Sequence, residues 1–391
     1  MSTFELGVSS HRQQCGGTSI TVSDGVAELT GCGISTVQHS YVMRDIDLRY
    51  ARILLIRLSA LGDIVLTSPA IRAIRQHLPR ARLTMLTDTP YRDLLSGNPN
   101  LDQVIDFQRK DKHLSTTHRL IQQLRAEKFD LVIDFQRKFR TSLIGFLCHA
   151  KARVGFHRPN GYLLTKVVPP SNLERYQHAI DSYFQLLHAL DIPATNRQLE
   201  LYVSDTDRLF AHTDLKQKGL LNGPLKVGLF PGASWDFKQW SPDRFVEIGQ
   251  RCVELYQGRI LVFGSPAEQK LADGIVEKIG EKAVSLAGEL SLGQLAAFIE
   301  QCDLFIANDT GPMHMATALG VPTISLFGPG NYHKFRPLED NHTAIRHEVP
   351  CSPCKQFNRC QSNICMQGIS VEAVWQATEQ KLTAFSSGSN A

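Results

Sequence analysis

Residues suited to binding a phosphate group gather in the segment 302–330, CDLFIANDTGPMHMATALGVPTISLFGPG. A short apolar run at 303–307 is typical of a strand buried in a parallel sheet. Helix-capping residues and a permissive glycine follow it: Asp309, Thr310 and Gly311. Pro312 then suits the first turn of a helix, whose free N–H groups and positive dipole end favour an anion. The segment therefore predicts a phosphate site, although an ordinary turn between a strand and a helix has the same pattern.

Three further side chains in the second half of the chain could serve such a site. Lys238 lies in a loop between a strand end at 230–232 and a helix start at 241, as either a solvated lysine or a point charge on a phosphate. Glu268 follows the next strand and either stabilises a helix start or accepts hydrogen bonds from sugar hydroxyls. His314 on its own would more commonly be a packing residue, so only its neighbours make it a candidate.

Asp63 is the candidate for acid–base chemistry in the first half of the chain. It lies with Gly62 in the first turn between a strand and a helix, SALGDI, which is a usual position for a functional loop in α/β folds. The turn has too few glycines for a dinucleotide-binding fingerprint, so binding of NAD is not supported. Asp63 could simply cap the helix, or it could act as a general base in a cleft between domains.

These residues need a scaffold, and from residue 51 the chain alternates strand and helix patterns. We expect strands at 51–58, 81–87, 101–107, 129–135, 152–156, 199–204, 225–232, 258–264, 282–288, 302–308 and 322–328. The clearest helix patterns are at 66–77, 114–128, 176–190 and 205–218. Such alternation predicts an α/β protein with two Rossmann-like, doubly wound parallel sheets, and a ligand bound between them over the carboxyl ends of the strands.

Domain boundaries follow from where the patterns stop. Asn222, Gly223 and Pro224 interrupt both periodicities and form the best candidate linker. We therefore expect one Rossmann-like domain at 49–222 and a second one at 223–391, which includes a cysteine-rich C-terminal segment. Residues 1–48 have many Gly and Ser and no helix pattern, so they predict a poorly defined extension or a small β-hairpin.

Composition and charge narrow the class of protein. With 391 residues, 42% hydrophobic and 20% charged, the chain has ordinary globular composition. It has neither a signal-peptide pattern nor an apolar run long enough for a membrane span, so we expect a cytoplasmic location. The net charge of +4 is uneven, because residues 106–158 hold 12 Lys and Arg against 5 Asp and Glu. The heptapeptide VIDFQRK occurs there twice, at 104–110 and 132–138, which predicts two similar strand ends followed by basic loops.

Four of the nine cysteines lie within 15 residues: Cys351, Cys354, Cys360 and Cys365. Their spacing, C-x2-C-x5-C-x4-C, suits a zinc or iron–sulfur site, and disulfides would be unusual in the cytoplasm. A metal bound here would lie away from the chemistry. The other five cysteines look like single, small apolar residues.

A resemblance to the ADP-heptose:lipopolysaccharide heptosyltransferase family extends over residues 53–374. It is carried by motifs in the expected order: SALGDIVLTSPAIRAIR, FDLVIDFQRKFRTSLI, ARVGF, PGASWDFKQWSPDRFVEI, NDTGPMHMATALGVPTISLFGP and a closing CSPC segment. The resemblance implies a glycosyltransferase of the GT-B fold, inverting and independent of metal, with no cofactor required for catalysis. Such an enzyme moves a heptose from ADP-heptose to a lipid-linked core sugar.

The resemblance also implies roles for the residues singled out above. Asp63 matches the catalytic carboxylate, Lys238 matches the lysine that contacts donor phosphates, and Glu268 falls where a donor-binding glutamate is expected. The donor loop D-T-G-x-x-H is matched by Asp309, Thr310, Gly311 and His314. Related cysteine tails occur in this family without an established catalytic metal, which argues for a structural or vestigial role of the cluster.

The acceptor implied by the resemblance is an anionic glycolipid. Basic residues of the first half could hold its phosphorylated sugars and bring the enzyme to the cytoplasmic face of the inner membrane: Arg137, Lys138, Arg140 and Arg158. A basic run is, however, commonly just a solvated face. We expect no nucleic-acid partner.

Two other interpretations stay open. One is a GT-B enzyme that uses another nucleotide sugar, or a sugar-nucleotide epimerase. The other is a non-catalytic family member that acts as a binding or metal-sensing module through its cysteine tail. The joint presence of Asp63, Lys238 and Asp309 argues against the second, because sequence drift would be expected to erase at least one of them.

Overall fold

The computed structural model describes residues 19–23, 26–30, 46–109, 111, 113–157, 161–169, 176–221, 225–354, 360 and 362–388. The chain forms two units, Met1–Ile46 and Asp47–Ala391. The described part of the first unit is an antiparallel hairpin of β1 (Ser19–Ser23) and β2 (Val26–Thr30). The small β-hairpin that the sequence allows in this region is therefore present.

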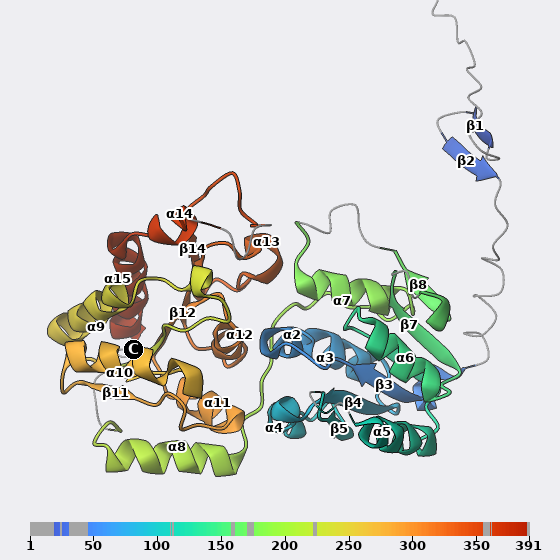
Figure 1. The fold of residues 1–391 in the computed structure, drawn as a ribbon, viewed down its shortest axis with the longest axis horizontal. Coiled ribbons are helices and arrows are strands. Elements are labelled where there is room, and N and C mark those ends of the chain that lie inside the picture. Colours follow the sequence, from blue (N-terminus) through green and yellow to red (C-terminus); the bar gives the residue numbers. More distant parts are fainter. Residues whose placement is uncertain are drawn as a thin grey trace, which may run out of the picture. The chain divides into compact units, whose positions relative to one another are not determined.

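The second unit contains two parallel sheets (Figure 1), of which the first has the strand order β5-β4-β3-β6-β7-β8. Its strands are β3 (Arg52–Ile56), β4 (Arg82–Asp88), β5 (Gln103–Phe107), β6 (Leu131–Asp134), β7 (Ala152–Phe156) and β8 (Lys166–Val168). The first five correspond to predicted strands. The edge strand β8 is too short, at three residues, to give a pattern in the sequence.

Helices flank both faces of this sheet: α2 (Leu61–Val65), α3 (Ser68–His77), α4 (Arg92–Ser96), α5 (Leu114–Ala126), α6 (Phe139–Leu147) and α7 (Ala179–His188). Leu54 and Ile56 of β3 belong to a buried cluster with residues of α5 and α6. Ile53 and Leu55 alternate with them and are just as buried, so they point to the opposite face. Burial on both faces explains why these strands are continuous apolar runs.

The second sheet has the strand order β11-β10-β9-β12-β13-β14 and its own hydrophobic core. Its strands are β9 (Lys226–Phe230), β10 (Arg259–Val262), β11 (Ala283–Ser285), β12 (Leu304–Asn308), β13 (Thr323–Phe327) and β14 (His342–Arg346). Its helices are α9 (Pro242–Tyr256), α10 (Gln269–Ile279), α11 (Leu292–Glu300), α12 (Gly311–Ala318), α13 (Tyr332–Phe335), α14 (Ile364–Gln367) and α15 (Val371–Gly388). We call each sheet with its helices the first and the second half. The edge strand β14, half-buried along its length, is the one that the sequence pattern missed.

Both sheets are doubly wound, because in each the strand order reverses beside the first strand of that sheet. The reversal lies between β3 and β6 in the first half and between β9 and β12 in the second half. Ligands of open α/β sheets bind at such points, outside the carboxyl ends of the strands. The loops after these four strands are therefore the place to look for a site.

The predicted linker at 222–224 lies outside the described residues, and the domain boundary there stays a prediction. The helix before it, α8 (Asp205–Gln217), packs against α11 of the second half. The rings of Phe210 and Phe298 lie 6.2 Å apart, and Arg208 Nε lies 2.8 Å from a carboxylate oxygen of Glu300. A chain segment N-terminal to the predicted linker thus belongs by packing to the second half.

The strand predicted at 199–204 is wrong, since this segment forms no ladder with either sheet. The backbone N–H of Glu200 donates to Ser68 Oγ at 2.9 Å, and the Glu200 carboxylate forms an ion pair with Arg72 of α3. The segment lies along α3 because side chains of that helix bind it. The alternation of apolar and polar residues at 199–204 therefore reflects packing of the segment against a helix and not pairing with a strand.

Candidate active site

Asp63 lies in the first turn of α2, directly after the loop that follows β3. Its carboxylate accepts a hydrogen bond from the backbone N–H of Ala60 at 3.2 Å and forms an ion pair with Arg57. The Tyr183 hydroxyl of α7 lies 3.5 Å from Asp63 Oδ1, which is long for a hydrogen bond. Because a quarter of the Asp63 side chain is exposed, it both caps the helix and stays open to a ligand.

The loop that carries Asp63 is held by side chains from the end of β6. Gln136 Oε1 accepts hydrogen bonds from the N–H groups of Leu58 and Ser59, at 2.8 and 3.0 Å. Arg57 Nη1 donates to the carbonyl of Phe135 at 2.6 Å. The sequence argument missed these contacts, although the repeated heptapeptide VIDFQRK contains Gln136 and could have drawn attention to it.

Asp134, the last residue of β6, is buried beneath this loop. It accepts hydrogen bonds from Gln136 N at 2.9 Å and from Ser142 Oγ at 3.1 Å. Burial raises the pKa of Asp134 to about 6, although these hydrogen bonds and the charge of Arg57 oppose the shift. Asp134 therefore lies behind the Asp63 loop as a second carboxylate, which the sequence argument had not selected.

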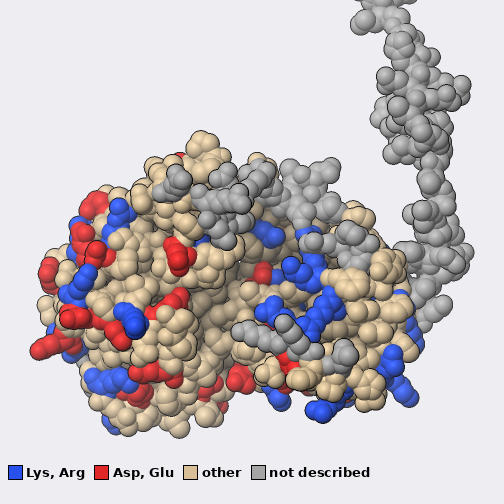
Figure 2. Space-filling view, viewed as in Figure 1, with Lys and Arg blue, Asp and Glu red and all other residues tan. Residues whose placement is uncertain are grey.

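Three of the four predicted acceptor residues, Arg137, Lys138 and Arg140, follow β6. Figure 2 shows Lys and Arg side chains gathered over the half with the first sheet, on the right of the view. The Arg137 guanidinium lies 3.8 Å from the ring centroid of Phe156, and that of Arg140 lies 4.7 Å from the ring centroid of Phe107. Lys138 is exposed at the start of α6, and Arg158 lies outside the described residues.

A cavity of about 300 Å³ opens beside Asp63 and is lined by both halves of the second unit. Its polar lining comes from the loops after β3 and β6, from α7 and from α13: Arg57, Asp63, Gln136, Arg137, Tyr183 and Lys334. Of the four predicted acceptor residues, Arg137 is the one that the described lining includes. The carboxylate predicted as the base thus faces a cavity whose described lining includes the basic residues Arg57, Arg137 and Lys334.

In the second half, Lys238 and Asp309 form a buried ion pair, with Nζ 2.6 Å from Oδ2. Their side chains are 14% and 6% exposed. Lys238 ends a short 3₁₀ helix, and its Nζ lies 5.1 Å from the ring centroid of Trp235 in the same loop. The structure thus brings together two residues that the sequence places 71 positions apart and that we had predicted for one phosphate site.

Asn308, the last residue of β12, fixes this arrangement and had not been predicted as a site residue. Its Nδ2 donates to the carbonyls of Pro231 and Gly232, at 2.7 and 3.3 Å, and its Oδ1 accepts from Trp240 N at 3.1 Å. The side chain is completely buried. One amide therefore ties the loop after β9 to the end of β12 on both sides of Lys238.

Glu268 lies at the same edge of the sheet, at the end of the turn after β10. Its carboxylate accepts hydrogen bonds from Ser265 N at 2.7 Å and from Ser265 Oγ at 2.8 Å. A side chain at Gly232 would overlap the Glu268 carboxylate, so the two loops touch at a glycine. Glu268 therefore caps its own turn, as one of the two interpretations expected, and its contact with sugar hydroxyls stays a prediction.

Thr310, Gly311 and His314 lie where α12 packs against α2 of the first half. A Cβ at Gly62 would lie 2.6 Å from the His314 ring, and a Cβ at Gly311 would lie 2.7 Å from Leu61. Burial lowers the pKa of His314 to about 4, opposed by the charge of Asp63 and reinforced by that of Lys238. His314 is therefore uncharged at neutral pH, and the charges of Asp63 and Lys238 both influence its pKa. Its contact with a donor stays a prediction.

The four clustered cysteines line one small cavity of about 60 Å³ together with Phe237 and Pro329. Hydrogen bonds from the backbone around Asn363 lower the pKa of Cys360, whereas burial raises the pKa of Cys365. Residues 355–359 and 361 of this segment lie outside the described part. Among the residues that are described, no three His, Cys, Asp or Glu side chains are arranged to hold a metal ion.

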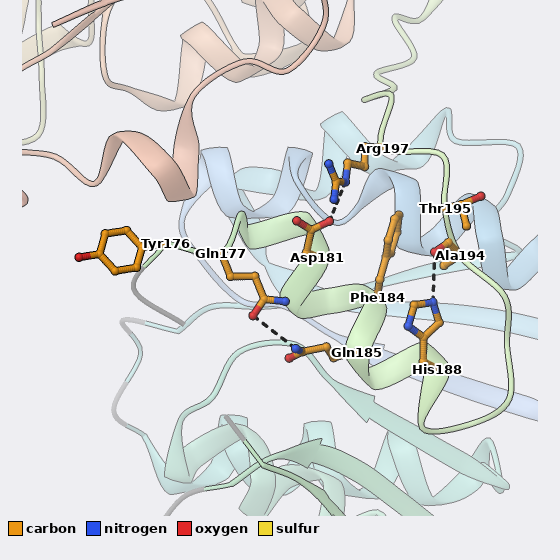
Figure 3. A pocket seen from close by; sticks show the side chains of 9 residues that line it. All are labelled: Tyr176, Gln177, Asp181, Phe184, Gln185, His188, Ala194, Thr195 and Arg197. Carbon is orange, nitrogen blue, oxygen red and sulfur yellow. Dashed lines mark hydrogen bonds and ion pairs between the residues drawn. The ribbon is translucent and has the colours of Figure 1, made fainter. Parts of the chain in front are cut away.

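A cavity of about 720 Å³, the largest we describe, lies elsewhere, along the outer side of α7 (Figure 3). Its polar side chains bind one another: Asp181 forms an ion pair with Arg197 at 2.7 Å, and Gln185 donates to Gln177 at 3.3 Å. His188 Nε2 lies 3.1 Å from the carbonyl of Ala194. Since no predicted site residue lines this cavity, its size alone does not make it the candidate site.

Nothing in the described residues suggests a membrane span, because no helix among them is both long and apolar enough to cross a bilayer.

Comparisons with known proteins bear on this geometry. The family model described as Glycosyltransferase family 9 (heptosyltransferase) matches residues 117–364. Lipooligosaccharide heptosyltransferase 2 of Campylobacter jejuni subsp. jejuni serotype O:6 is 28% identical over 325 residues, which cover 80% of this chain and 94% of that protein.

Solved structures match as well. The glycosyl transferase family 9 from Veillonella parvula matches with a TM-score of 0.80 and 27% identity, over 87% of this chain and 99% of that chain. The E. coli ADP-heptose lps heptosyltransferase II matches with a TM-score of 0.71 and 21% identity, over 86% of this chain and 99% of that chain. These likenesses confirm the expected GT-B fold.

Proposed function

Because the chain belongs to glycosyltransferase family 9, the heptosyltransferase family, we propose that it transfers a heptose from a nucleotide sugar to the core of a lipopolysaccharide or lipooligosaccharide. The chain is a glycosyltransferase by its family. The relative from Campylobacter jejuni named above is a lipooligosaccharide heptosyltransferase, which supports the sugar and the class of acceptor.

The observation that carries the proposal is the placement of Asp63 and Lys238 on either side of the α2–α12 contact. Both charges act on His314, which lies at that contact. Asp63 faces a cavity that could hold an acceptor, and Lys238 lies with Asp309 at the carboxyl ends of the second sheet. A base on one side and a cation on the other are what transfer of a sugar from a diphosphate requires.

In the proposed mechanism Asp63 acts as general base. Its carboxylate takes the proton of the acceptor hydroxyl, whose oxygen attacks the anomeric carbon from the side opposite the diphosphate, so the configuration inverts. The bond from the anomeric carbon to the phosphate oxygen breaks, and negative charge develops on the leaving diphosphate. Lys238 and the first N–H groups of α12 would neutralise that charge.

For the donor we propose ADP-heptose, with Thr310 and Gly311 contributing backbone N–H groups to the diphosphate. Glu268 would accept hydrogen bonds from ribose hydroxyls, and its position over Gly232 at the edge of the second sheet supports this role. His314 would hold the donor loop against α2 and not bind the phosphate as a cation, because its lowered pKa leaves it neutral at pH 7.

For the acceptor we propose an anionic glycolipid that reaches Asp63 from the basic surface of the first half. Arg137 lines the cavity beside Asp63, and Lys138 and Arg140 lie in the same loop and the helix that follows it. This surface would also bring the enzyme to anionic lipids at the cytoplasmic face of the inner membrane. Binding to anionic vesicles should then weaken as salt concentration rises.

Assay of the purified protein with ADP-heptose and a core acceptor lacking the terminal heptose tests the proposal. We expect release of ADP, and a product whose new linkage has the anomeric configuration opposite to that of the donor by NMR. Calorimetric titration with ADP, GDP and UDP should show the tightest binding for ADP. Binding of UDP or GDP with none of ADP would overturn the donor, and retention of configuration would overturn the mechanism.

We propose a structural role for the cysteine cluster, with zinc or iron as the metal if one is bound. Its spacing and the shared cavity support this, and that cavity contains neither Asp63 nor Lys238. Metal analysis of the purified protein, with transfer measured before and after chelation, is the test. Loss of transfer without loss of thermal stability would contradict a structural role.

A further inference from the structure

The two copies of the heptapeptide VIDFQRK end on opposite sides of the loop that carries Asp63. The first copy runs through β5 and the second runs through β6. In the sheet β6 lies directly beside β3, whereas β4 separates β5 from β3. Because neighbouring strands are about 4.8 Å apart, a side chain of the first copy must reach about twice as far as one of the second copy to touch the loop after β3.

The two copies contact the same atom of that loop through different residues. In the second copy, Nε2 of Gln136 donates to Ser59 Oγ at 3.3 Å. In the first copy it is the longer side chain of Arg109 that reaches the loop, and its Nη1 donates to Ser59 Oγ at 2.9 Å. The two bonds use both lone pairs of the hydroxyl oxygen, so Ser59 is held from two sides.

Asp88, the last residue of β4, orients Arg109 across the strand that lies between. Its Oδ1 accepts a hydrogen bond from Arg109 N at 2.8 Å, and its Oδ2 lies 3.2 Å from Arg109 Nε. The Asp88 side chain is only 8% exposed, so its charge needs the guanidinium as a partner. These contacts direct Nη1 of Arg109 at Ser59, and they form a row across the ends of four neighbouring strands, β5, β4, β3 and β6.

Ser59 lies where a shift of its position would move the Asp63 carboxylate. It precedes Asp63 by four residues, and the N–H of the next residue, Ala60, donates to that carboxylate at 3.2 Å. Arg109 and Asp88 do not belong to the described lining of the cavity beside Asp63. Their effect on a ligand in that cavity would therefore pass through the loop.

We infer that Arg109 is a positioning residue, which acts on Asp63 through the Ser59 hydroxyl. Gln136 holds the same hydroxyl from the other side, and Asp88 orients Arg109 for its contact. The inference rests on the proposed function, in which Asp63 is the general base. It assigns this arginine of the basic segment to the placement of the base and not to the binding of the acceptor.

Two single variants remove the contact in different ways. Ser59→Ala removes the shared oxygen, and Arg109→Lys keeps a positive charge beside Asp88 but lacks the guanidinium fork that binds two groups at once. We expect each to lower kcat about 10- to 100-fold because the carboxylate is misplaced, with the Kd for ADP and the acceptor KM unchanged. Gln108→Ala is the matched control, because Gln108 is the exposed counterpart of Gln136 in the first copy, and it should behave as wild type.

The double variant shows whether Arg109 acts through Ser59. If it does, Ser59→Ala combined with Arg109→Lys should have the kcat of Ser59→Ala alone, because the contact is already absent. Effects on kcat that multiply in the double variant would overturn the inference. So would a higher acceptor KM in Arg109→Lys with an unchanged kcat, which is the behaviour of a side chain that binds the acceptor.

Amide hydrogen exchange of residues 58–63, measured by mass spectrometry without any substrate, separates this inference from the proposed function. We expect exchange about 5- to 10-fold faster than in wild type for Ser59→Ala and for Arg109→Lys, as for loss of one hydrogen bond, and no change for Gln108→Ala. Faster exchange in both variants supports the inference even when the wild type transfers no heptose. Wild-type exchange in both variants overturns it even when the wild type is active.

Discussion

The loop after β3 and the loop after β12 both place an aspartate at the start of a helix and pair it with a cation, but they obtain the cation differently. Asp63 pairs with Arg57 of its own loop and stays 25% exposed. Asp309 pairs with Lys238, from the loop after another strand, and is 6% exposed. The first pair leaves a carboxylate facing a cavity, and the second connects two loops.

This difference suggests that the two aspartates have different roles, Asp309 a structural one and Asp63 a ligand-facing one. A buried charge needs a partner, and removal of that partner leaves an uncompensated ion. Asp309 therefore fixes the position of Lys238 more than it offers itself to a ligand. Asp63 can give up part of its contact with Arg57 to solvent or to a ligand, as the proposed role of general base requires.

Replacement of each aspartate by asparagine tests the difference between them most directly. Asp63→Asn should lower kcat about 10²- to 10⁴-fold, because the amide cannot take the acceptor proton, and should leave ADP binding intact. Asp309→Asn should act on stability, lowering the free energy of unfolding by about 1–3 kcal/mol. Full transfer activity in Asp63→Asn would refute the base assignment. Wild-type stability in Asp309→Asn would refute the structural role of Asp309.

Lys238→Gln tests the cation of the second pair. We expect the Kd for ADP, measured by calorimetry, to rise about 10- to 100-fold because a charged contact to the diphosphate is lost. Lys270→Gln, on the exposed face of α10, is the matched control and should bind ADP as the wild type does. An unchanged Kd in Lys238→Gln would remove the phosphate contact from the proposal.

The helices that follow the two loops touch at glycines, and alanine there should disturb both loops together. Gly62→Ala and Gly311→Ala would each place a methyl group in van der Waals overlap, with the His314 ring and with Leu61. We expect each to lower the free energy of unfolding by about 1–3 kcal/mol in denaturant titrations. Gly274→Ala in α10, where a Cβ meets nothing within 4 Å, is the control and should be neutral or slightly stabilising.

A fall in pH should act on the His314 ring, which lies where α12 packs against α2. Its folded-state pKa of about 4 lies below the ordinary value of 6.5, so the unfolded chain binds the proton first as pH falls. Stability should therefore be full above pH 6.5 and be lost between pH 6.5 and 4, by about 1 kcal/mol for the first pH unit. His314→Gln should make this decline shallower without abolishing it, because burial also lowers the pKa of His178, to about 3. The exposed His212→Gln should leave the decline unchanged. A parallel decline in wild type and His314→Gln would contradict the assignment.

The scaffold and the chemical residues could be predicted from sequence because both leave local patterns. Ten of the eleven predicted strands exist, since buried parallel strands are continuous apolar runs and the turns after them hold Gly, Pro and Asp. The eleventh, at 199–204, failed because side chains of α3 bind it. Strands β8 and β14 were missed because one is short and the other is only half-buried.

What supports the site could not be predicted, because it depends on contacts between distant parts of the chain. Gln136 binds the backbone of a loop 77 residues away, and Asn308 binds carbonyls 76 and 77 residues away. A buried Gln or Asn has no periodicity that marks it. The cavity beside Asp63 was missed for a similar reason, since its lining combines residues of the first half with Lys334 and Phe335 of the second half.

The contact between Lys238 and Trp235 gives the proposed donor site a natural fluorescent probe. Of the chain's three tryptophans, Trp240 and Trp375 are buried, and Trp235 is 41% exposed with the ammonium of Lys238 5.1 Å from its ring. A diphosphate that draws Lys238 away would change the electric field at that exposed indole. Intrinsic fluorescence of the unmodified protein should therefore follow occupancy of the proposed nucleotide site, without label or radioactive sugar.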